Sequence, residues 1–258
     1  STPEGTLFPY TTLFRSKLKV YQGMRMNKLF LSVLAPLFLA SCASEYQIEG
    51  SSSVSRLDGK MLFVKMPKSD GMVKVDSAEI IHGLFTMKGE IDSTYIASLY
   101  MDEESIMPFV MEQGNIRIKI ENTNISVVGT PLNDRLNDFI VKKNSLDDRA
   151  YELERLESRL IMDGVSQQEI DEQMNEERNK LSDEMNALAK SFIQSNYENV
   201  LGPGVFILLC NSFPYPMLTP VVEEIVNEAP ECFQNNMMVT EYMQVARENM
   251  KKIEASEY

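Results

Sequence analysis

The residues best suited to chemistry in this sequence are its three cysteines, and the first of them has the most informative surroundings. Cys42 follows Leu39-Ala40-Ser41, which closes an apolar run that begins at Leu29. A basic start, Met24-Arg25-Met26-Asn27-Lys28, precedes that run. A charged head, a short apolar middle and small residues before a cut site are the parts of a secretory signal. We therefore expect residues 24–41 to be a signal peptide that is cleaved between Ser41 and Cys42.

The cysteine at the expected cleavage site makes this signal more specific. Leu39-Ala40-Ser41-Cys42 resembles the bacterial lipobox, in which the cysteine thiol is diacylated and becomes the first residue of the mature protein. The resemblance implies lipidation of Cys42, a tether over residues 42–45 and a membrane contact made by lipid. The expected location is a bacterial envelope membrane, with the protein facing the periplasm or the cell exterior.

Two other interpretations of the apolar run are disfavoured. A membrane-spanning helix needs about 20 apolar residues, and this run is shorter. A buried core helix would be broken by Pro36 in the middle of the run.

Residues 1–23 do not fit a secreted protein. A signal acts from the N-terminus, so translation would begin at Met24 or Met26. Residues 6–16 are similar, residue for residue, to one reading frame of a common sequencing adapter. We interpret residues 1–23 as an artefactual extension, the alternative being a natural disordered one.

The charge balance limits the partners of the mature chain. Residues 42–258 hold 20 Lys and Arg against 37 Asp and Glu, a formal net charge of −17. Nucleic acid and anionic lipid are both bound through Lys and Arg that neutralise phosphate. We therefore expect no nucleic-acid partner, and we expect the polypeptide to stay soluble beside its membrane.

The two remaining cysteines, Cys210 and Cys232, leave two interpretations open. An extracytoplasmic compartment permits a disulfide between them. Alternatively, Cys210 is a small buried apolar residue within Phe206-Ile207-Leu208-Leu209-Cys210. Neither cysteine belongs to a Cys-x-x-Cys pair, so this chain contains no thioredoxin-type redox motif.

From Tyr46 onward, short apolar runs alternate with Gly, Asp and Asn, a pattern typical of strands and turns. Ile116-Arg117-Ile118-Lys119-Ile120 alternates strictly, which predicts one buried and one wet face. Turns are expected at Asp58-Gly59, Asp70-Gly71, His82-Gly83 and Gln113-Gly114, where two-residue turns favour hairpins. The spacing predicts an antiparallel β-sandwich over residues 46–130. The expected strands are Tyr46–Glu49, Met61–Met66, Val73–Ile80, Leu84–Gly89, Tyr95–Met101, Ile106–Met111, Asn115–Glu121 and Ile125–Val128.

At Thr130-Pro131 the pattern changes to helical spacing, with Thr as the N-cap and Pro in the first position. Two apolar stripes separated by Gly164 predict an antiparallel helical hairpin with an acidic outer face. A partner-binding coiled coil is the alternative. Shorter helices follow, with a bend at Gly202-Pro203-Gly204 and a new start at Thr219-Pro220. The fold class is therefore α+β, with a helical subdomain over residues 131–258.

A family resemblance rests on several turn residues in order. These are Tyr46-x-Ile48-x-Gly50, Asp58-Gly59, Asp76-Ser77, Gly83-x-Phe85-x-x-x-Gly89, Glu112-x-Gly114 and Gly129-Thr130-Pro131-Leu132-Asn133. Residues from Tyr46 to about Phe139 resemble domain of unknown function 4369. The resemblance implies a place before a thioredoxin-like domain of the alkyl hydroperoxide reductase/thiol-specific antioxidant type. That domain is absent from this chain, either through truncation or because the protein is a stand-alone relative, so no reactive cysteine is carried over.

Other candidate residues have plainer explanations. His82 is the only histidine and is expected to fill a turn, so a catalytic triad or multi-His metal site has no basis. Asp102-Glu103-Glu104 and Asp147-Asp148 could hold calcium, but solvated charge is favoured. The methionines are expected to be packing material, with copper or oxidant sensing as the alternative. Phe213-Pro214-Tyr215-Pro216 is either a contact patch or a linker packed on the body.

These patterns predict no cofactor, no metal and no catalytic residue. The first functional hypothesis is a non-catalytic lipoprotein module that binds or positions a partner in the envelope. The second is the N-terminal part of a thiol–disulfide oxidoreductase whose catalytic domain is missing. A third is a sandwich that binds a small extracytoplasmic ligand.

Overall fold

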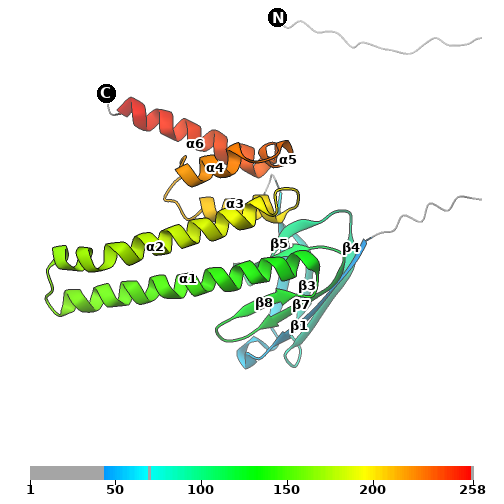
Figure 1. The fold of residues 1–258 in the computed structure, drawn as a ribbon. Helices are drawn as coiled ribbons and strands as arrows, with labels where there is room; N and C mark the ends of the chain where they lie inside the picture. Colours follow the sequence, from blue (N-terminus) through cyan, green and yellow to red (C-terminus); the bar gives the residue numbers. More distant parts are fainter. Residues whose placement is uncertain (1–43, 69–70, 257–258) are drawn as a thin grey trace, which may run out of the picture. The chain divides into compact units, whose positions relative to one another are not determined.

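The computed structural model describes residues 44–68 and 71–256, and in these the eight expected strands form two packed sheets (Figure 1). One sheet has the order β4-β1-β7-β8 and the other β3-β2-β5-β6. The α+β fold class is confirmed. The strands are β1 (Ser44–Ser52), β2 (Met61–Lys68), β3 (Gly71–Glu79), β4 (Leu84–Ile91), β5 (Tyr95–Met101), β6 (Glu104–Met111), β7 (Gly114–Ile120) and β8 (Ile125–Val128).

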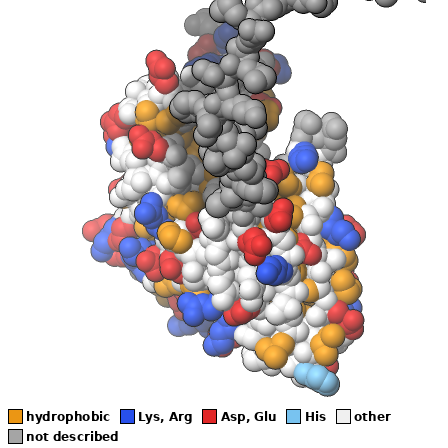
Figure 2. Space-filling view, turned by 90° about the vertical axis from the view of Figure 1, so that its right-hand side faces the viewer, with side chains coloured by type: hydrophobic (Ala, Val, Ile, Leu, Met, Phe, Trp, Pro, Cys, Tyr) orange, Lys and Arg blue, Asp and Glu red, His pale blue; other side chains and the backbone are white. Residues whose placement is uncertain are grey.

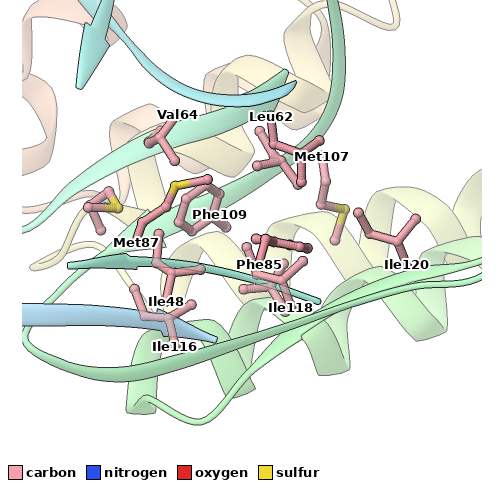
Figure 3. Close-up of a cluster of buried hydrophobic side chains, with 14 of the residues drawn as sticks. Ile48, Leu62, Val64, Phe85, Met87, Met107, Phe109, Ile116, Ile118 and Ile120 are labelled. Atoms are coloured by element: carbon pink, nitrogen blue, oxygen red, sulfur yellow. The ribbon is translucent and has the colours of Figure 1, made fainter. Parts of the chain in front are cut away.

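The core lies between the sheets because alternate residues of each strand point inward. Ile116, Ile118 and Ile120 of β7 are buried, whereas Arg117 and Lys119 are exposed, as the strict alternation predicts. Figure 3 shows side chains of both sheets meeting in this layer, with Leu62, Val64 and Phe109 facing Ile48, Phe85 and Ile118.

One pairing differs from the antiparallel prediction. β1 pairs with β7 in parallel, with Ile48 opposite Ile116, while all other pairs of named strands are antiparallel. No hairpin sets the relative direction of β1 and β7, because five strands separate them along the chain. Their direction depends instead on the points at which the chain changes sheets.

Two of the expected turns lie where the chain changes sheets. The turn at His82-Gly83 closes a single antiparallel bridge, in which Ile81 and Leu84 exchange backbone hydrogen bonds of 2.9 and 3.0 Å. His82 and Gly83 have positive φ angles of 52° and 75° and carry the chain from β3 to β4. Gln113 lies between β6 and β7. Within a sheet, Lys68 faces Gly71 across the β2–β3 hairpin. Asp102, with φ of 53°, closes the β5–β6 hairpin that the turn signals missed.

The predicted helical hairpin consists of α1 (Pro131–Met162) and α2 (Gln167–Gln194). Gly164, at φ +78°, ends the first helix, and Ser166 and Glu169 begin the second with reciprocal capping bonds. Arg149 pairs with Glu184 and Arg178 with Glu157, so the helices run antiparallel.

Within residues 44–68 and 71–256, four further α-helices follow the hairpin: α3 (Leu201–Cys210), α4 (Pro220–Asn227), α5 (Glu231–Gln234) and α6 (Met237–Ser256). The expected bend at Gly202-Pro203-Gly204 lies instead inside α3, where Pro is tolerated in a first turn. A Cβ at Gly204 would come within 2.0 Å of the Ile96 side chain, so the glycine lets α3 approach β5 closely.

A second apolar cluster holds these helices together and reaches the sandwich through β6. Phe206 lies edge-on to both Phe233 and Tyr242, with ring centroids 5.6 and 5.7 Å apart. Val110 of β6 belongs to this cluster, whereas its neighbours Phe109 and Met111 belong to the sandwich core. Both faces of β6 are therefore covered near its end.

Candidate functional site

The expected lipidation and cleavage residues, Cys42 and Ser41, lie outside the described part of the chain. The folded body starts very soon after them. β1 begins at Ser44, and Tyr46 is already buried. The expected tether over residues 42–45 therefore overlaps the first two residues of β1.

The other two cysteines are free thiols in different surroundings. Cys210, at the end of α3, is 2% exposed, while Cys232 of α5 is exposed and lies 3.9 Å from the carbonyl oxygen of Tyr197. Of the two interpretations left open for these cysteines, the Cys210–Cys232 disulfide is not formed in the structure, and Cys210 is a buried free thiol. Burial raises the pKa of the Cys210 thiol to about 12, and burial likewise raises the pKa of neighbouring Tyr242 to about 12.

We predict that the two thiols differ sharply in reactivity. Only a thiolate alkylates readily, so Cys232 should react with iodoacetamide at pH 8 while Cys210 stays unmodified until the protein unfolds. The folded protein holds the Cys210 proton more tightly than the unfolded chain does, because in the unfolded chain the thiol has its usual pKa of 9.0. The stabilisation that this raised pKa contributes should therefore be fully present below about pH 9. It should be lost as the pH rises toward 12, so the free energy of unfolding should fall over that range.

Peptide mass spectrometry of partially alkylated protein measures this difference directly. Equal alkylation of both cysteines under native conditions would contradict the buried position of Cys210. A Cys210→Ala variant should retain more of its stability between pH 9 and pH 12 than the unmodified protein does, relative to neutral pH.

A buried polar network joins the sandwich to the first helix. The Glu112 carboxylate accepts hydrogen bonds from the backbone N–H groups of Leu132 (2.9 Å) and Asn133 (3.1 Å). These groups lie in the first turn of α1, where helix N–H groups lack partners and a negative charge is favoured. Thr130 occupies the N-cap position as predicted but makes no side-chain capping bond, because Glu112 supplies it.

Asn133 completes the junction by bonding to the edge of a sheet. Its amide oxygen accepts from the Val110 N–H (2.8 Å), and its amide nitrogen donates to the Val110 carbonyl (2.7 Å). The same nitrogen donates to the Thr130 hydroxyl at 2.8 Å. β6 is an edge strand, so this side chain pairs with backbone groups that no further strand would satisfy.

Two aromatic side chains cover glycines across the β1–β4 ladder. Phe85 lies opposite Gly50, and a Cβ at Gly50 would come within 1.9 Å of its ring. Tyr46 lies opposite Gly89, where a Cβ would approach the ring to 3.0 Å or less. An aromatic ring over a glycine fills space that the glycine leaves empty and pins the register of two strands.

Tyr46 also links the two sheets. Its hydroxyl donates to Asp76 of β3 at 2.7 Å. Burial, followed by the bond to the Asp76 carboxylate, raises the pKa of Tyr46 well above its usual value of 10.0. The phenol therefore stays protonated at all physiological pH values and acts as a donor.

The outer part of the α1–α2 hairpin carries an open groove of about 600 Å³. Arg149 and Glu152 line it beside Leu153 and Leu156. Tyr151, Ile161 and Met162 of α1 are also exposed, Met162 to 85%. This combination of charged and apolar side chains suits contact with another protein, and the partner-binding coiled coil stays a prediction.

Three of the carboxylates considered for calcium, Asp102, Glu103 and Asp147, lie within ion-pair distance of a lysine. Asp102 lies 3.8 Å from Lys60, and Asp147 bonds to Lys143. Within residues 44–68 and 71–256, no group of three His, Cys, Asp or Glu side chains is arranged to hold a metal ion.

The rigid loop from Phe213 to Pro216 packs on the helical core, as the linker interpretation predicts. Phe213 contacts the helical apolar cluster, and the Pro216 carbonyl accepts from Asn249 at 2.9 Å. The Tyr242 hydroxyl bonds to both the N–H and the carbonyl of Met217 just beyond it. Tyr215, at 43% exposure, is the part of the loop open to another molecule.

Comparison with known protein families finds a match over the region that contains both the Glu112–Asn133 network and the β1–β4 pairing. Residues 46–136 match the model of a domain of unknown function, DUF4369. No curated protein matches the chain. The DUF4369 match extends past the last strand into α1 and therefore includes Asn133.

The motif residues that first indicated DUF4369 have structural roles here. Gly50 and Gly89 accept the aromatic rings, Asp58 accepts from the Gly83 N–H at 3.1 Å, and Glu112 caps α1. Gly129 has φ of +104°, and a Cβ there would lie 2.6 Å from the Asn115 carbonyl oxygen. The pattern specifies how the sandwich closes and how α1 leaves it. These residues stand out in the sequence, but the contacts that they make depend on strands and helices distant along the chain.

Proposed function

We propose that this chain is a cell-envelope lipoprotein, anchored through Cys42, whose folded part is a non-catalytic module that binds or positions a partner. The observation that carries the proposal is the place of Cys42. It closes a signal-like segment, and the folded body begins two residues later with β1. Cleavage before Cys42 would therefore leave every described strand and helix intact.

The contacts within the body support a binding role. Glu112, Asn133 and Tyr46 are buried, and their side chains form hydrogen bonds within the folded body. The groups that remain available lie on the surface, above all on the α1–α2 hairpin with its exposed Tyr151 and Met162. Exposed apolar residues beside charged ones are typical of protein contact surfaces.

The anchor is tested by replacing Cys42 with alanine in the full chain. We expect the variant to accumulate as unprocessed precursor and to lose all incorporation of labelled fatty acid, because acylation needs the thiol. Cys232→Ala is the matched control, since Cys232 is exposed but lies far along the chain, and it should be processed and labelled normally. Unchanged labelling of Cys42→Ala would refute the anchor.

The second candidate is the N-terminal part of a thioredoxin-like thiol–disulfide oxidoreductase. Its support is the resemblance of the motif residues to DUF4369, which implies a following thioredoxin-like domain; the DUF4369 model matches residues 46–136, and its description names no function. The genomic DNA after the Tyr258 codon, read in frame, separates the candidates, because a thioredoxin pattern with Cys-x-x-Cys would favour the oxidoreductase. The chain alone should not reduce insulin, and turnover would contradict a non-catalytic module.

None of the helices within residues 44–68 and 71–256 has the length and apolar character needed to cross a bilayer.

A further inference from the structure

The strand register brings several chain segments to one end of the sandwich. Ser44 lies opposite Ile91, Tyr46 opposite Gly114, and Tyr95 opposite Met111. The start of β1 therefore lies beside the β4–β5 loop and the β6–β7 loop. We call Ser44, residues 92–94 and residues 113–115 the anchor end of the sandwich.

Cys42 is joined to this end by a very short connection. Only Ala43 separates it from Ser44. Extended chain covers at most about 3.6 Å per residue, so the two residues allow about 7 Å between Cys42 and the start of β1. A lipid on Cys42 would therefore hold the start of β1 within about 7 Å of the lipidated residue, and so close to the headgroups.

The chemistry of the anchor end suits such a position. Residues 92–94 and 113–115 are all exposed and read Asp-Ser-Thr and Gln-Gly-Asn. They carry a single carboxylate, although the chain from residue 42 onward has a net charge of −17. Nearby Glu45 is 3.4 Å from Lys88, which offsets its charge. Small uncharged polar side chains approach phospholipid headgroups with little electrostatic repulsion.

The opposite end of the sandwich is different. The turn between β3 and β4 holds His82, flanked by Ile81 and Leu84, which are 58% and 62% exposed. Figure 2 shows the histidine, in pale blue, at a tip of the molecule with hydrophobic side chains near it. The length of β4, at about 3.3 Å per residue, places this tip roughly 26 Å from the anchor end.

We propose that the anchor end of the sandwich lies directly against the bilayer surface and that the His82 turn points away from the membrane. This proposal rests on the anchoring of Cys42 under the proposed function. It gives the module a defined orientation, with the β3–β4 turn as the surface presented to the envelope space.

The test uses the full chain, lipidated in a bacterial host and reconstituted into vesicles of zwitterionic and anionic phospholipid. Cys232→Ser removes the exposed thiol, and buried Cys210 stays unlabelled. A donor dye is then attached at Ser93→Cys, at Gln113→Cys or, at the far end, at His82→Cys. Energy transfer to an acceptor on lipid headgroups reports the distance of each site from the membrane.

We expect transfer from positions 93 and 113 to exceed that from position 82 severalfold. A matched variant with a flexible glycine–serine insertion between Ala43 and Ser44 should lower the values at positions 93 and 113 toward that at position 82. Thermal unfolding checks that each labelled variant is folded.

The possible results separate the two proposals. Labelled fatty acid on Cys42 together with equal transfer from both ends, or greater transfer from position 82, would overturn the orientation and leave the anchor standing. Absence of fatty acid from Cys42 would overturn the anchor and the orientation with it.

Discussion

Replacing Asn133 with alanine is expected to lower the free energy of unfolding by about 3 kcal/mol. The side chain is 1% exposed and makes three hydrogen bonds, two of them to the backbone of Val110. Without it, an N–H and a carbonyl at the edge of β6 remain buried and unpaired, and each such group costs about 1–3 kcal/mol.

Urea denaturation measures this effect as a lower midpoint at an unchanged slope. Asn144→Ala is the matched control, because Asn144 is exposed on the same helix. Its effect should stay within about 0.5 kcal/mol. Asn133→Asp keeps the acceptor but loses the donor and adds a charge near Glu112, so it should be destabilised as well. An Asn133→Ala variant as stable as the control would show that the junction contributes nothing to folding.

Replacing Gly50 with alanine should cost about 2–3 kcal/mol, because its methyl group would overlap the Phe85 ring. The ring is 3% exposed and packed in the sandwich core, so it has little room to move. Gly164→Ala is the matched control, with a positive φ of 78° but no atom within 4 Å of the added carbon. It should cost only the backbone strain, about 1 kcal/mol.

A double-mutant cycle isolates the contact between the ring and the glycine. Phe85→Ala alone should cost about 3–5 kcal/mol, as expected for a buried aromatic residue. In that background Gly50→Ala should be almost neutral, so the coupling between the two positions should reach about 2 kcal/mol. Strictly additive effects would mean that the ring does not occupy the space above Gly50.

The two predictions concern residues that the sequence singled out for another reason. Gly50, Phe85 and Asn133 were part of a family resemblance, and turn residues of this kind gave no hint of their partners. Their contacts span 35 and 23 positions of the chain. A local pattern cannot indicate such partners, because the pairing depends on which strands become neighbours.

Other errors of prediction have the same origin. The two-residue turn at His82-Gly83 has the backbone that its sequence indicates and closes the bridge between Ile81 and Leu84, but the strands that it joins, β3 and β4, belong to different sheets. Gly202 and Gly204 looked like a break in the chain. They instead allow a helix to pack closely on Asn196 and Ile96, because a Cβ at either position would overlap those neighbours.

Local sequence was sufficient for the eight strands, for the hairpin helices with their boundary at Gly164, and for the expectation of a lipid anchor at Cys42. Alternation, helical spacing, capping residues and a signal-like run are all properties of neighbouring residues, so they can be recognised before the chain folds. Tertiary structure alone decided the parallel pairing of β1 with β7, the cap that Glu112 provides for α1 and which of the two interpretations of Cys210 holds. Each of these depends on residues distant in sequence being brought within a few ångströms, where hydrogen bonds and packing select one arrangement.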